Sequence, residues 1–275
     1  MKDYTIEKVD VDDNSLMLVC GLLQTAFSKS IKFSFEYIQW QYRQNPIGKI
    51  VGYNAFARDG VLAAHYVAMP IVMTLFGERK KGLLSLNTAT HPDHRGKKLF
   101  SILADRTYRE AVENNFDFVI GVANANSTHG FLHNLGFYLI APLNLRFGLG
   151  NNIFTKQAES FNCYRTWDEE TLNWRLQSPK NKYSCRKNIF SSPISFFMKT
   201  LSCVEIPLKL PKTSRMLPLN LYVGLGADLQ KGTYFRVPSF IKHSPFNLIF
   251  KDLTGKLPVI KKEDMFFQLI DFDVI

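Results

Sequence analysis

An apolar segment, a basic turn and an amphipathic helix follow one another without a break between residues 83 and 114. The segment LLSLNTAT (83–90) predicts a buried strand, and FSILADRTYREAVEN (100–114) has the apolar spacing of a helix. The turn between them, HPDHRGKK, carries the basic stretch 95–98. A helix N-terminus presents unpaired N–H groups and the positive end of the helix dipole, so this arrangement predicts an anion site.

Two common phosphate-binding motifs are absent from this region. The turn lacks the GxxxxGK[ST] pattern of a P-loop. It also lacks the GxGxxG pattern and the following acidic residue of a dinucleotide-binding Rossmann unit. The anion must therefore be held by a different strand-to-helix scaffold.

The rest of the first half predicts a mixed α/β architecture. The expected helices cover residues 13–27, 35–43, 100–114 and 127–135, and the expected strands cover 51–58, 61–73, 83–90, 116–124 and 137–148. Asp59-Gly60 suits a tight turn between the first two strands. The order α-α-β-β-β-α-β-α-β predicts an α+β mixed sheet with helices packed on it.

A segment of the second half resembles a segment of the first. The segment DEETLNWRLQSP (168–179) resembles SFEYIQWQYRQNP (34–46), because each is a capped helix with a tryptophan and a later proline. This similarity predicts an internal duplication. Later apolar segments fit a second α/β unit, and we expect two domains, 1–148 and 149–275. Nothing similar to HRGKKLF recurs, so only the first copy is expected to keep the anion loop.

The basic turn resembles motif A of the GNAT superfamily of N-acyltransferases, roughly R/Q-x-x-G-x-G/A. Arg95 takes the first position, whereas Lys98 and Phe100 replace the two small residues. A second GNAT signature, a strand, an asparagine, a short helix and Gly-Phe, is matched by FVIGVANANSTHGFLHNLGF (118–137). The resemblance covers residues 1–148 and implies the GNAT fold, followed by a second, degenerate GNAT-like domain. It also implies acyl-coenzyme A as co-substrate, and no metal.

The resemblance implies a set of coenzyme-binding residues. The strand backbone would pair with the pantetheine arm, and the turn would hold the pyrophosphate. These residues are Thr88, Ala89, Thr90, Arg95, Gly96, Lys97, Lys98, Leu99, Phe100, Ser101, Asn126 and Phe131. A lysine at position 98 is expected to keep ordinary backbone angles. Its ammonium group either reaches the phosphates or is solvated. Phe100 is expected to pack under the helix rather than to touch the ligand.

GNAT catalysis, as the resemblance implies, is direct attack of an amine on the thioester, with the Thr88 N–H as a donor to the carbonyl oxygen. The usual base and acid positions are Leu84 and Leu132, neither of which can transfer a proton.

Replacement candidates for the missing acid and base are His65 in the neighbouring strand, His129 on the short helix and Glu36 near the acceptor. His129 and His133 lie one turn apart and share a face. The alternatives are that His65 is a hydrogen-bonded sheet residue and that water removes the proton.

A softer resemblance, to bacterial N-acyltransferases of surface-polysaccharide pathways, concerns the acceptor. It is based on W-x-Y-x-x-N-P (40–46), His-Pro-Asp before Arg95, Ser-Pro-Phe (244–246) and the terminal DFDV (271–274). It implies a nucleotide-linked amino sugar as acceptor. The implied acceptor-binding residues are Glu36, Trp40, Tyr42, Arg236 and Lys242, with Arg175 as a further cation.

Composition leaves three other functions open. The net charge is +10, and the basic excess is larger in residues 151–275 (18 Lys and Arg against 11 Asp and Glu) than in 1–150 (16 against 13). The alternatives are an acyltransferase for another amine, an acyl-coenzyme A sensor, and a nucleic-acid-binding protein. The scattered basic residues do not favour the last. We expect a cytoplasmic protein with free thiols, because no apolar run of 18 residues, signal-like start or paired cysteine spacing is present.

Overall fold

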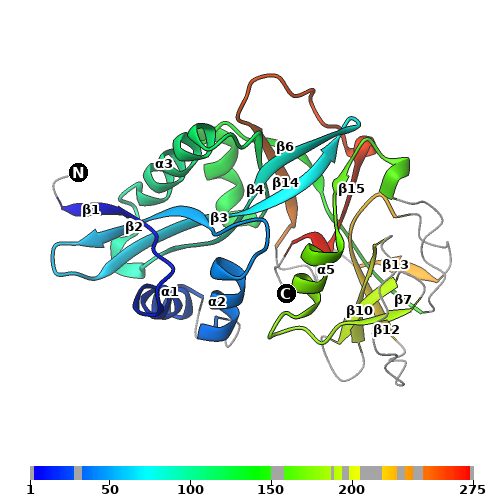
Figure 1. Ribbon diagram of the computed structural model, residues 1–275, viewed down its shortest axis with the longest axis horizontal. Helices are drawn as coiled ribbons and strands as arrows, with labels where there is room; N and C mark the ends of the chain where they lie inside the picture. Colours follow the sequence, from blue (N-terminus) through cyan, green and yellow to red (C-terminus); the bar gives the residue numbers. More distant parts are fainter. Residues whose placement is uncertain are drawn as a thin grey trace.

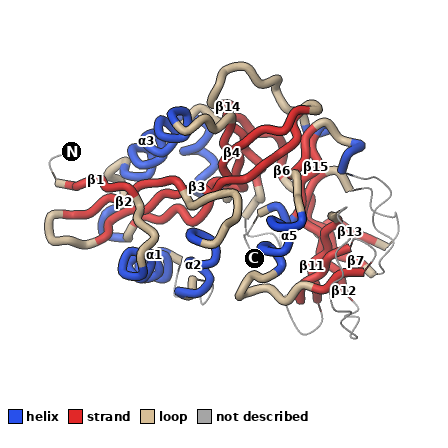
Figure 2. Tube along the Cα trace, in the orientation of Figure 1, coloured by secondary structure: helices blue, strands red, loops and turns tan. Residues whose placement is uncertain are grey.

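The computed structural model describes residues 3–27, 33–149, 158–186, 189–193, 198–204, 219–227, 233–237 and 244–272. Within these residues the strands join into one 15-stranded sheet that runs through both halves of the chain (Figures 1 and 2). No helix in the described part of the chain is long and apolar enough to cross a membrane. None of the four cysteines forms a disulfide with another described residue.

The first half is a sheet with helices on both faces. Its strands are β1 (Tyr4–Lys8), β2 (Val51–Ala57), β3 (Leu62–Leu75), β4 (Glu78–Thr90), β5 (Phe118–Ala123) and β6 (Tyr138–Pro142). Helices α1 (Asp13–Ala26) and α2 (Phe35–Arg43) cover one face, and α3 (Leu99–Glu113) and α4 (Ala125–His129) cover the other (Figure 1). Each face has its own apolar core. The mixed α/β fold expected from the sequence is confirmed.

Local signals set most of these boundaries. The side chain of Asp12 accepts a hydrogen bond from the backbone of α1, and that of Ser34 from the backbone of α2, so each caps its helix as expected for these residue types. Gly60 has a φ of +83°, which suits the tight turn between β2 and β3. The helix expected at 127–135 is α4 continued by a single π-helical turn, η2 (Gly130–Asn134).

Two strand predictions need correction. Residues 4–8 form β1, which pairs antiparallel with β2 and was not expected, because its alternation of half-buried and exposed positions is weak. Residues 137–148 were expected to be one strand but form two, β6 and β7 (Asn144–Gly148). The chain leaves the first half at Leu143, so β6 and β7 join different parts of the sheet.

Four strands of the second half pair in the same pattern as four strands of the first. The elements of the second half are η3 (Ala158–Ser160), β8 (Cys163–Arg165), α5 (Glu169–Leu176), β9 (Ser184–Arg186), β10 (Ile189–Pro193), β11 (Met198–Cys203), β12 (Leu219–Leu225), β13 (Tyr234–Arg236), β14 (Asn247–Asp252), η4 (Lys262–Asp264), β15 (Met265–Gln268) and η5 (Leu269–Asp271). Strands β9, β10 and β11 pair antiparallel in order, and β12 is parallel to β11. This is the pairing of β2, β3, β4 and β5.

The two copies meet at a symmetric pair of tryptophans. The rings of Trp40 in α2 and Trp174 in α5 stack with their centroids 4.5 Å apart and an angle of 15° between their planes. The Nε1 of each ring donates to the carbonyl of the other tryptophan, at 3.0 and 3.2 Å. The two helices whose sequences resemble each other therefore contact each other reciprocally, as an internal duplication would predict. The duplication itself remains a prediction.

The copies also exchange a strand. Strand β14 of the second half lies between β5 and β6, and β7 of the first half lies between β12 and β13. The exchanged segments have similar sequences, APLNLRF (141–147) and SPFNLIF (244–250). The Leu143 N–H donates to the Phe246 carbonyl at 2.7 Å where they cross. One strand of each half therefore completes the sheet of the other, and the division into domains at 148/149 remains a prediction.

Candidate functional site

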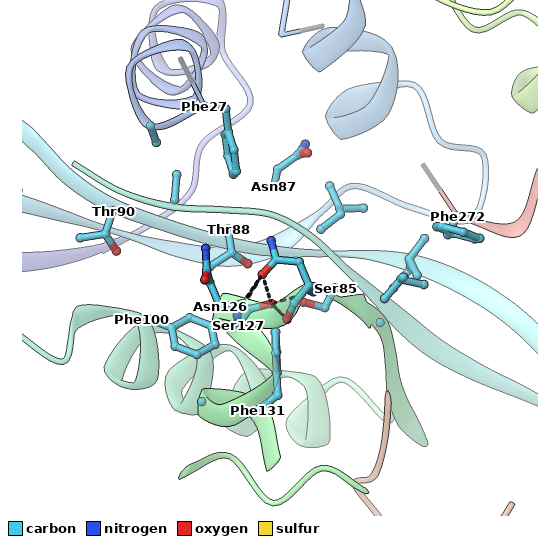
Figure 3. Close-up of a pocket in the computed structure, with 18 of the residues that line it drawn as sticks. Phe27, Ser85, Asn87, Thr88, Thr90, Phe100, Asn126, Ser127, Phe131 and Phe272 are labelled. Atoms are coloured by element: carbon cyan, nitrogen blue, oxygen red, sulfur yellow. Dashed lines mark hydrogen bonds between the residues drawn. The ribbon is translucent and has the colours of Figure 1, made fainter. Parts of the chain in front are cut away.

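A cavity of about 870 Å³ opens where β4 and β5 separate (Figure 3). The two strands pair in parallel from Gly82 with Phe118 to Ser85 with Gly121, and no further pairs between them are formed. Beyond Ser85, the β5-facing edge of β4 has no ladder partner among the described strands. Unpaired backbone polar groups at such an edge are available to a ligand. The cavity can therefore take an extended molecule between the strands.

A β-bulge in β4 lies beside this cavity. The pairing of β3 with β4 shifts between His65 and Val67, so that Asn87 and Thr88 occupy the place of one residue. Asn87 has a φ of +48°, a value that asparagine tolerates better than most residues. Its Nδ2 donates to Gln41 Oε1 at 2.6 Å and to Tyr42 Oη at 3.2 Å. Helix α2 thus holds the bulge in place.

Behind the bulge lies a buried chain of hydrogen bonds. His65 is 1% exposed, with Nδ1 2.6 Å from Asn54 Oδ1 and Nε2 2.9 Å from Tyr42 Oη. Burial lowers the pKa of His65 to about 3, so its ring is neutral. An amide oxygen only accepts, so the proton is on Nδ1, and the Tyr42 hydroxyl donates to Nε2.

The structure therefore does not place His65 as a base at the cavity. His65 is the hydrogen-bonded sheet histidine of the alternative interpretation, and its side chain does not line the cavity. Trp40 and Tyr42, which were expected to bind the acceptor, are also buried, at 3% and 0% exposure. Their side chains join α2 to α5 and to the bulge, respectively.

The first residues of the basic turn are held against β1. Pro92–His94 form a 3₁₀ turn (η1), and His94 Nδ1 lies 3.0 Å from Tyr4 Oη of β1. Arg95 lines the cavity, and Gly96 follows with a φ of +77°. Helix α3 begins at Leu99 without a side-chain cap on its first amides, which an anion can therefore satisfy.

The expected backbone of Lys98 is wrong. Lys98 has φ 59° and ψ 15°, the left-handed conformation that a glycine would adopt most easily. It therefore keeps the turn geometry of the usual glycine despite its side chain. Arg95, Lys97 and Lys98 are exposed, and none of them forms an ion pair with a described residue. The turn is a cationic surface at the mouth of the cavity.

Phe100 lines the cavity instead of packing only under the helix, which corrects the expectation for this residue. Its ring packs edge-on against Phe131 at 5.1 Å between centroids and lies near Tyr66. Gly130 allows this packing, because a Cβ added there would lie 2.8 Å from the Phe100 ring. Together with Phe131, the ring forms an apolar wall on the α3 and α4 side (Figure 3).

Helix α4 lies on the same side of the cavity as this wall and is held by the segment that contains β14. Asn124 caps it through Oδ1, which accepts from the N–H groups of Asn126 and Ser127 at 3.0 Å. Ser244 Oγ accepts from the Ala125 N–H at 2.9 Å, and Asn247 donates to Thr128 Oγ1 at 2.9 Å. The Ser-Pro-Phe segment singled out in the sequence therefore positions α4 next to the cavity.

The cavity brings together part of the predicted coenzyme set. Its lining includes Thr88, Ala89, Thr90, Arg95, Phe100, Asn126 and Phe131. Gly96, Lys97 and Lys98 lie in the adjoining turn, Ser101 lies in the first turn of α3, and Leu99 is buried in the core. The roles of these residues toward the coenzyme remain predictions.

Most of the predicted acceptor and proton-transfer residues lie elsewhere. Glu36 is exposed near the start of α2, and His129 and His133 are exposed with their rings 4.4 Å apart, so they share a face as expected. None of these three lines the cavity. Arg236 is exposed in β13, and Lys242 lies outside the described residues.

Arg175 is not available to an acceptor, contrary to its suggested role as a cation. It is 4% exposed and donates to the carbonyl groups of Ile270 and Phe272. Its side chain therefore fixes the end of the described chain.

Sequence reasoning missed the far side of the cavity. Ala26, Phe27, Phe33, Leu86, Val122 and Phe272 line it together with Leu84. Phe272 belongs to the DFDV segment, which was noted but given no position. Nothing in the local pattern shows that residues 27, 33 and 272 converge, because they are brought together only by the fold. Ser85 was missed for the same reason.

The equivalent opening in the second copy is filled by the chain itself. Strands β11 and β12 pair up to Leu201 with Tyr222, as β4 and β5 pair up to Ser85. Beyond that point β15 pairs with β12, and the side chain of Gln268 bonds to both the N–H and the carbonyl of Cys203 in β11. Among the described residues, β15 and Gln268 therefore occupy the opening in the second half, whereas no strand fills the opening between β4 and β5.

Comparisons with known proteins identify proteins that share this fold. Residues 11–140 match the acetyltransferase (GNAT) domain family. No curated protein sequence matches the chain. The fold resembles a probable N-acyltransferase from Enterococcus faecalis, with a TM-score of 0.63 and 8% identity over 91% of this chain and 73% of that one.

Two further structures share the fold at low identity. N-myristoyltransferase of Saccharomyces cerevisiae, solved with bound myristoyl-CoA, has a TM-score of 0.53 and 11% identity over 74% of this chain and 66% of that one. A glucosamine N-acetyltransferase region of a fungal multi-domain β-N-acetylglucosaminidase has a TM-score of 0.52 and 10% identity over 90% of this chain and 38% of that one. Residues 11–140 thus resemble a GNAT acetyltransferase domain, and acyl-CoA-dependent N-acyltransferase is the activity that this match supports.

Proposed function

We propose that the chain binds acyl-CoA in the cavity between β4 and β5 and transfers the acyl group to an amine. The observation that carries the proposal is the separation of these strands at a bulge, with a basic turn at its mouth. The coenzyme's pyrophosphate would lie at the first amides of α3 beside Arg95. The pantetheine arm would pair with the free edge of β4 at residues 88–90.

The bulge supplies the polarising group. Thr88 follows Asn87 directly and lines the cavity, so its N–H can donate to the thioester oxygen as negative charge develops there. Holding amine and thioester together supplies the remaining acceleration. None of the predicted bases, His65, His129 and Glu36, lines the cavity, so we propose that a water molecule removes the amine proton.

We propose an amino sugar as the acceptor to be tested first. Support comes from the resemblance noted in the sequence and from the fold shared with a glucosamine N-acetyltransferase region. In the described lining, Arg95 is the one cationic side chain, and the coenzyme requires it. A nucleotide-linked sugar would therefore need cations outside this lining for its own diphosphate. Use of acyl-CoA, together with four cysteines that form no disulfide among the described residues, favours a cytoplasmic location.

The second candidate is a non-catalytic acyl-CoA sensor. It is favoured by Leu84 and Leu132 at the positions where GNAT enzymes usually carry the base and the acid. A sensor would bind the coenzyme in the same cavity but would not release thiol.

The test is thiol release from acetyl-CoA and longer acyl-CoAs with a panel of free and nucleotide-linked amino sugars, polyamines and peptides. We expect release with at least one amine, and loss of about one order of magnitude in affinity for the coenzyme in Arg95→Ala. Arg58→Ala, an exposed arginine away from the cavity, is the matched control. Coenzyme binding without release across the panel would favour the sensor. Absence of binding would refute both.

A further inference from the structure

Three hydroxyl groups form a line from the cavity into the protein. Ser85 lines the cavity at the last paired position of β4. Its Oγ lies 2.9 Å from Tyr66 Oη, and Tyr66 Oη lies 2.6 Å from Tyr108 Oη. Both tyrosines are buried, at 0% and 5% exposure. The line therefore has a single end at the cavity, and that end is Ser85.

Ser85 lies on the side of the cavity where the sulfur of the coenzyme is expected. Its side chain, like Phe100 and Phe131, lies toward α3 and α4, whereas Phe27 and Asn87 lie on the opposite side (Figure 3). The basic turn is at the mouth of the cavity and Ser85 is at the point where the strands meet. A coenzyme that enters with its pyrophosphate at the turn brings its sulfur toward this closed end.

Gly121 leaves room beside this hydroxyl. It is the β5 partner of Ser85, and a Cβ added to it would lie 3.3 Å from the Ser85 Cβ. A larger side chain at position 121 would therefore fill the space next to the serine. The glycine keeps that space accessible to a ligand atom.

The two hydrogen bonds can run in one direction that gives each hydroxyl a partner. The Tyr108 hydroxyl has the Tyr66 oxygen within hydrogen-bond distance, and Tyr66 is in turn next to Ser85. If Tyr108 donates to Tyr66 and Tyr66 donates to Ser85, each buried hydroxyl is satisfied. Burial raises the pKa of Tyr66 to about 12, so that it stays protonated and able to donate near neutral pH. The Ser85 proton is then directed to the cavity.

We propose that Ser85 donates a hydrogen bond to the coenzyme sulfur as the thioester breaks, and that Tyr66 and Tyr108 position its hydroxyl. The inference rests on the proposed acyl transfer. The amine nitrogen bonds to the carbonyl carbon, the carbon–sulfur bond breaks, and its electron pair moves to sulfur. Ser85 stabilises the resulting thiolate. The proton that the amine loses balances the one that the thiolate finally takes up from solvent.

The test compares two donors that differ only in the leaving atom, acetyl-CoA and its seleno analogue. Their release by water or by the best amine of the panel is followed in wild type and in Ser85→Ala. We expect kcat with acetyl-CoA to fall about 10- to 100-fold at an unchanged KM, the loss typical of one hydrogen bond to a developing charge. With the selenoester the loss should be several-fold smaller, because a selenolate is less basic and needs less stabilisation.

Positioning by the tyrosines is tested in the same assay. Tyr66→Phe should lower kcat with acetyl-CoA, again less with the selenoester, whereas Tyr222→Phe should change neither. Tyr222 is a matched control because it is equally buried and its hydroxyl donates to the Leu225 carbonyl in the second copy.

Three outcomes separate the proposals. An equal loss on both donors in Ser85→Ala would show a structural role, and no loss would show no role; either overturns the inference but leaves the acyl transfer intact. A wild-type protein that releases neither thiol nor selenol would instead refute the proposed function itself. Thermal unfolding of each variant shows whether it has folded.

Discussion

Replacing Tyr42 by phenylalanine tests whether the buried network holds the β4 bulge. The Tyr42 hydroxyl donates to His65 Nε2 at 2.9 Å and accepts from Asn87 Nδ2 at 3.2 Å, and it is completely buried. Removing the Tyr42 hydroxyl leaves His65 Nε2 without its donor, whereas Asn87 Nδ2 still donates to Gln41 Oε1. An unsatisfied buried group costs about 1–3 kcal/mol, so the free energy of unfolding should fall by about 1–3 kcal/mol.

That loss corresponds to a fall in Tm of roughly 2–12 °C for a chain of this size. Differential scanning calorimetry measures it, and Tyr138→Phe is the control, because its half-buried hydroxyl accepts one bond from the Ile260 N–H. Acyl transfer should fall by a larger factor than in the control, measured at a temperature where both variants are folded, since the bulge places the Thr88 N–H. If Tyr42→Phe unfolded with the wild-type free energy and kept wild-type kcat/KM, the network would not support the bulge.

Three other predictions follow from the same contacts. Trp174→Ala should lower the free energy of unfolding by about 3–5 kcal/mol, measured by denaturant titration, because it removes the stacked ring and both reciprocal hydrogen bonds with Trp40; a loss below 1 kcal/mol would contradict the paired interface. Burial lowers the pKa of His65 to about 3, so as pH falls the unfolded chain binds a proton at this histidine before the folded chain does. The free energy of unfolding should therefore fall between about pH 6.5 and pH 3. The Tm of His65→Gln should depend less on pH in that range, and a pH profile identical to that of the wild type would contradict the neutral ring. Because β15 fills the second opening, calorimetry should give one acyl-CoA per chain, and two sites would show that this opening also admits ligand.

Much of the first half could be predicted because its signals are local. Helix caps such as Ser34, the Asp59-Gly60 turn and the strand-to-helix turn at Arg95 each depend on a few adjacent residues. The similarity between the two helices that carry Trp40 and Trp174 could also be recognised, because it is a local sequence pattern. Its meaning, a stacked pair between the two halves, required the fold.

What could not be predicted depends on contacts between distant segments. A strand such as β7 has the same alternation whichever sheet it joins, so the exchange with β14 is invisible in its sequence. His65 has the ordinary pKa and chemistry of a base until Asn54 and Tyr42 enclose it. Lys98 shows that a residue type alone does not settle backbone geometry, because the turn imposes a left-handed conformation on it.

The most direct test of the account is calorimetric titration of acetyl-CoA into the wild-type chain and into Gly121→Leu. A leucine at this position would extend from a Cβ already 3.3 Å from Ser85 into the space between β4 and β5. The account predicts one binding site in the wild type and at least a 100-fold weaker affinity, about 2.7 kcal/mol, in a variant that unfolds at a similar temperature. Equal affinity in a folded Gly121→Leu chain, or no binding by the wild type, would contradict a coenzyme site between these strands.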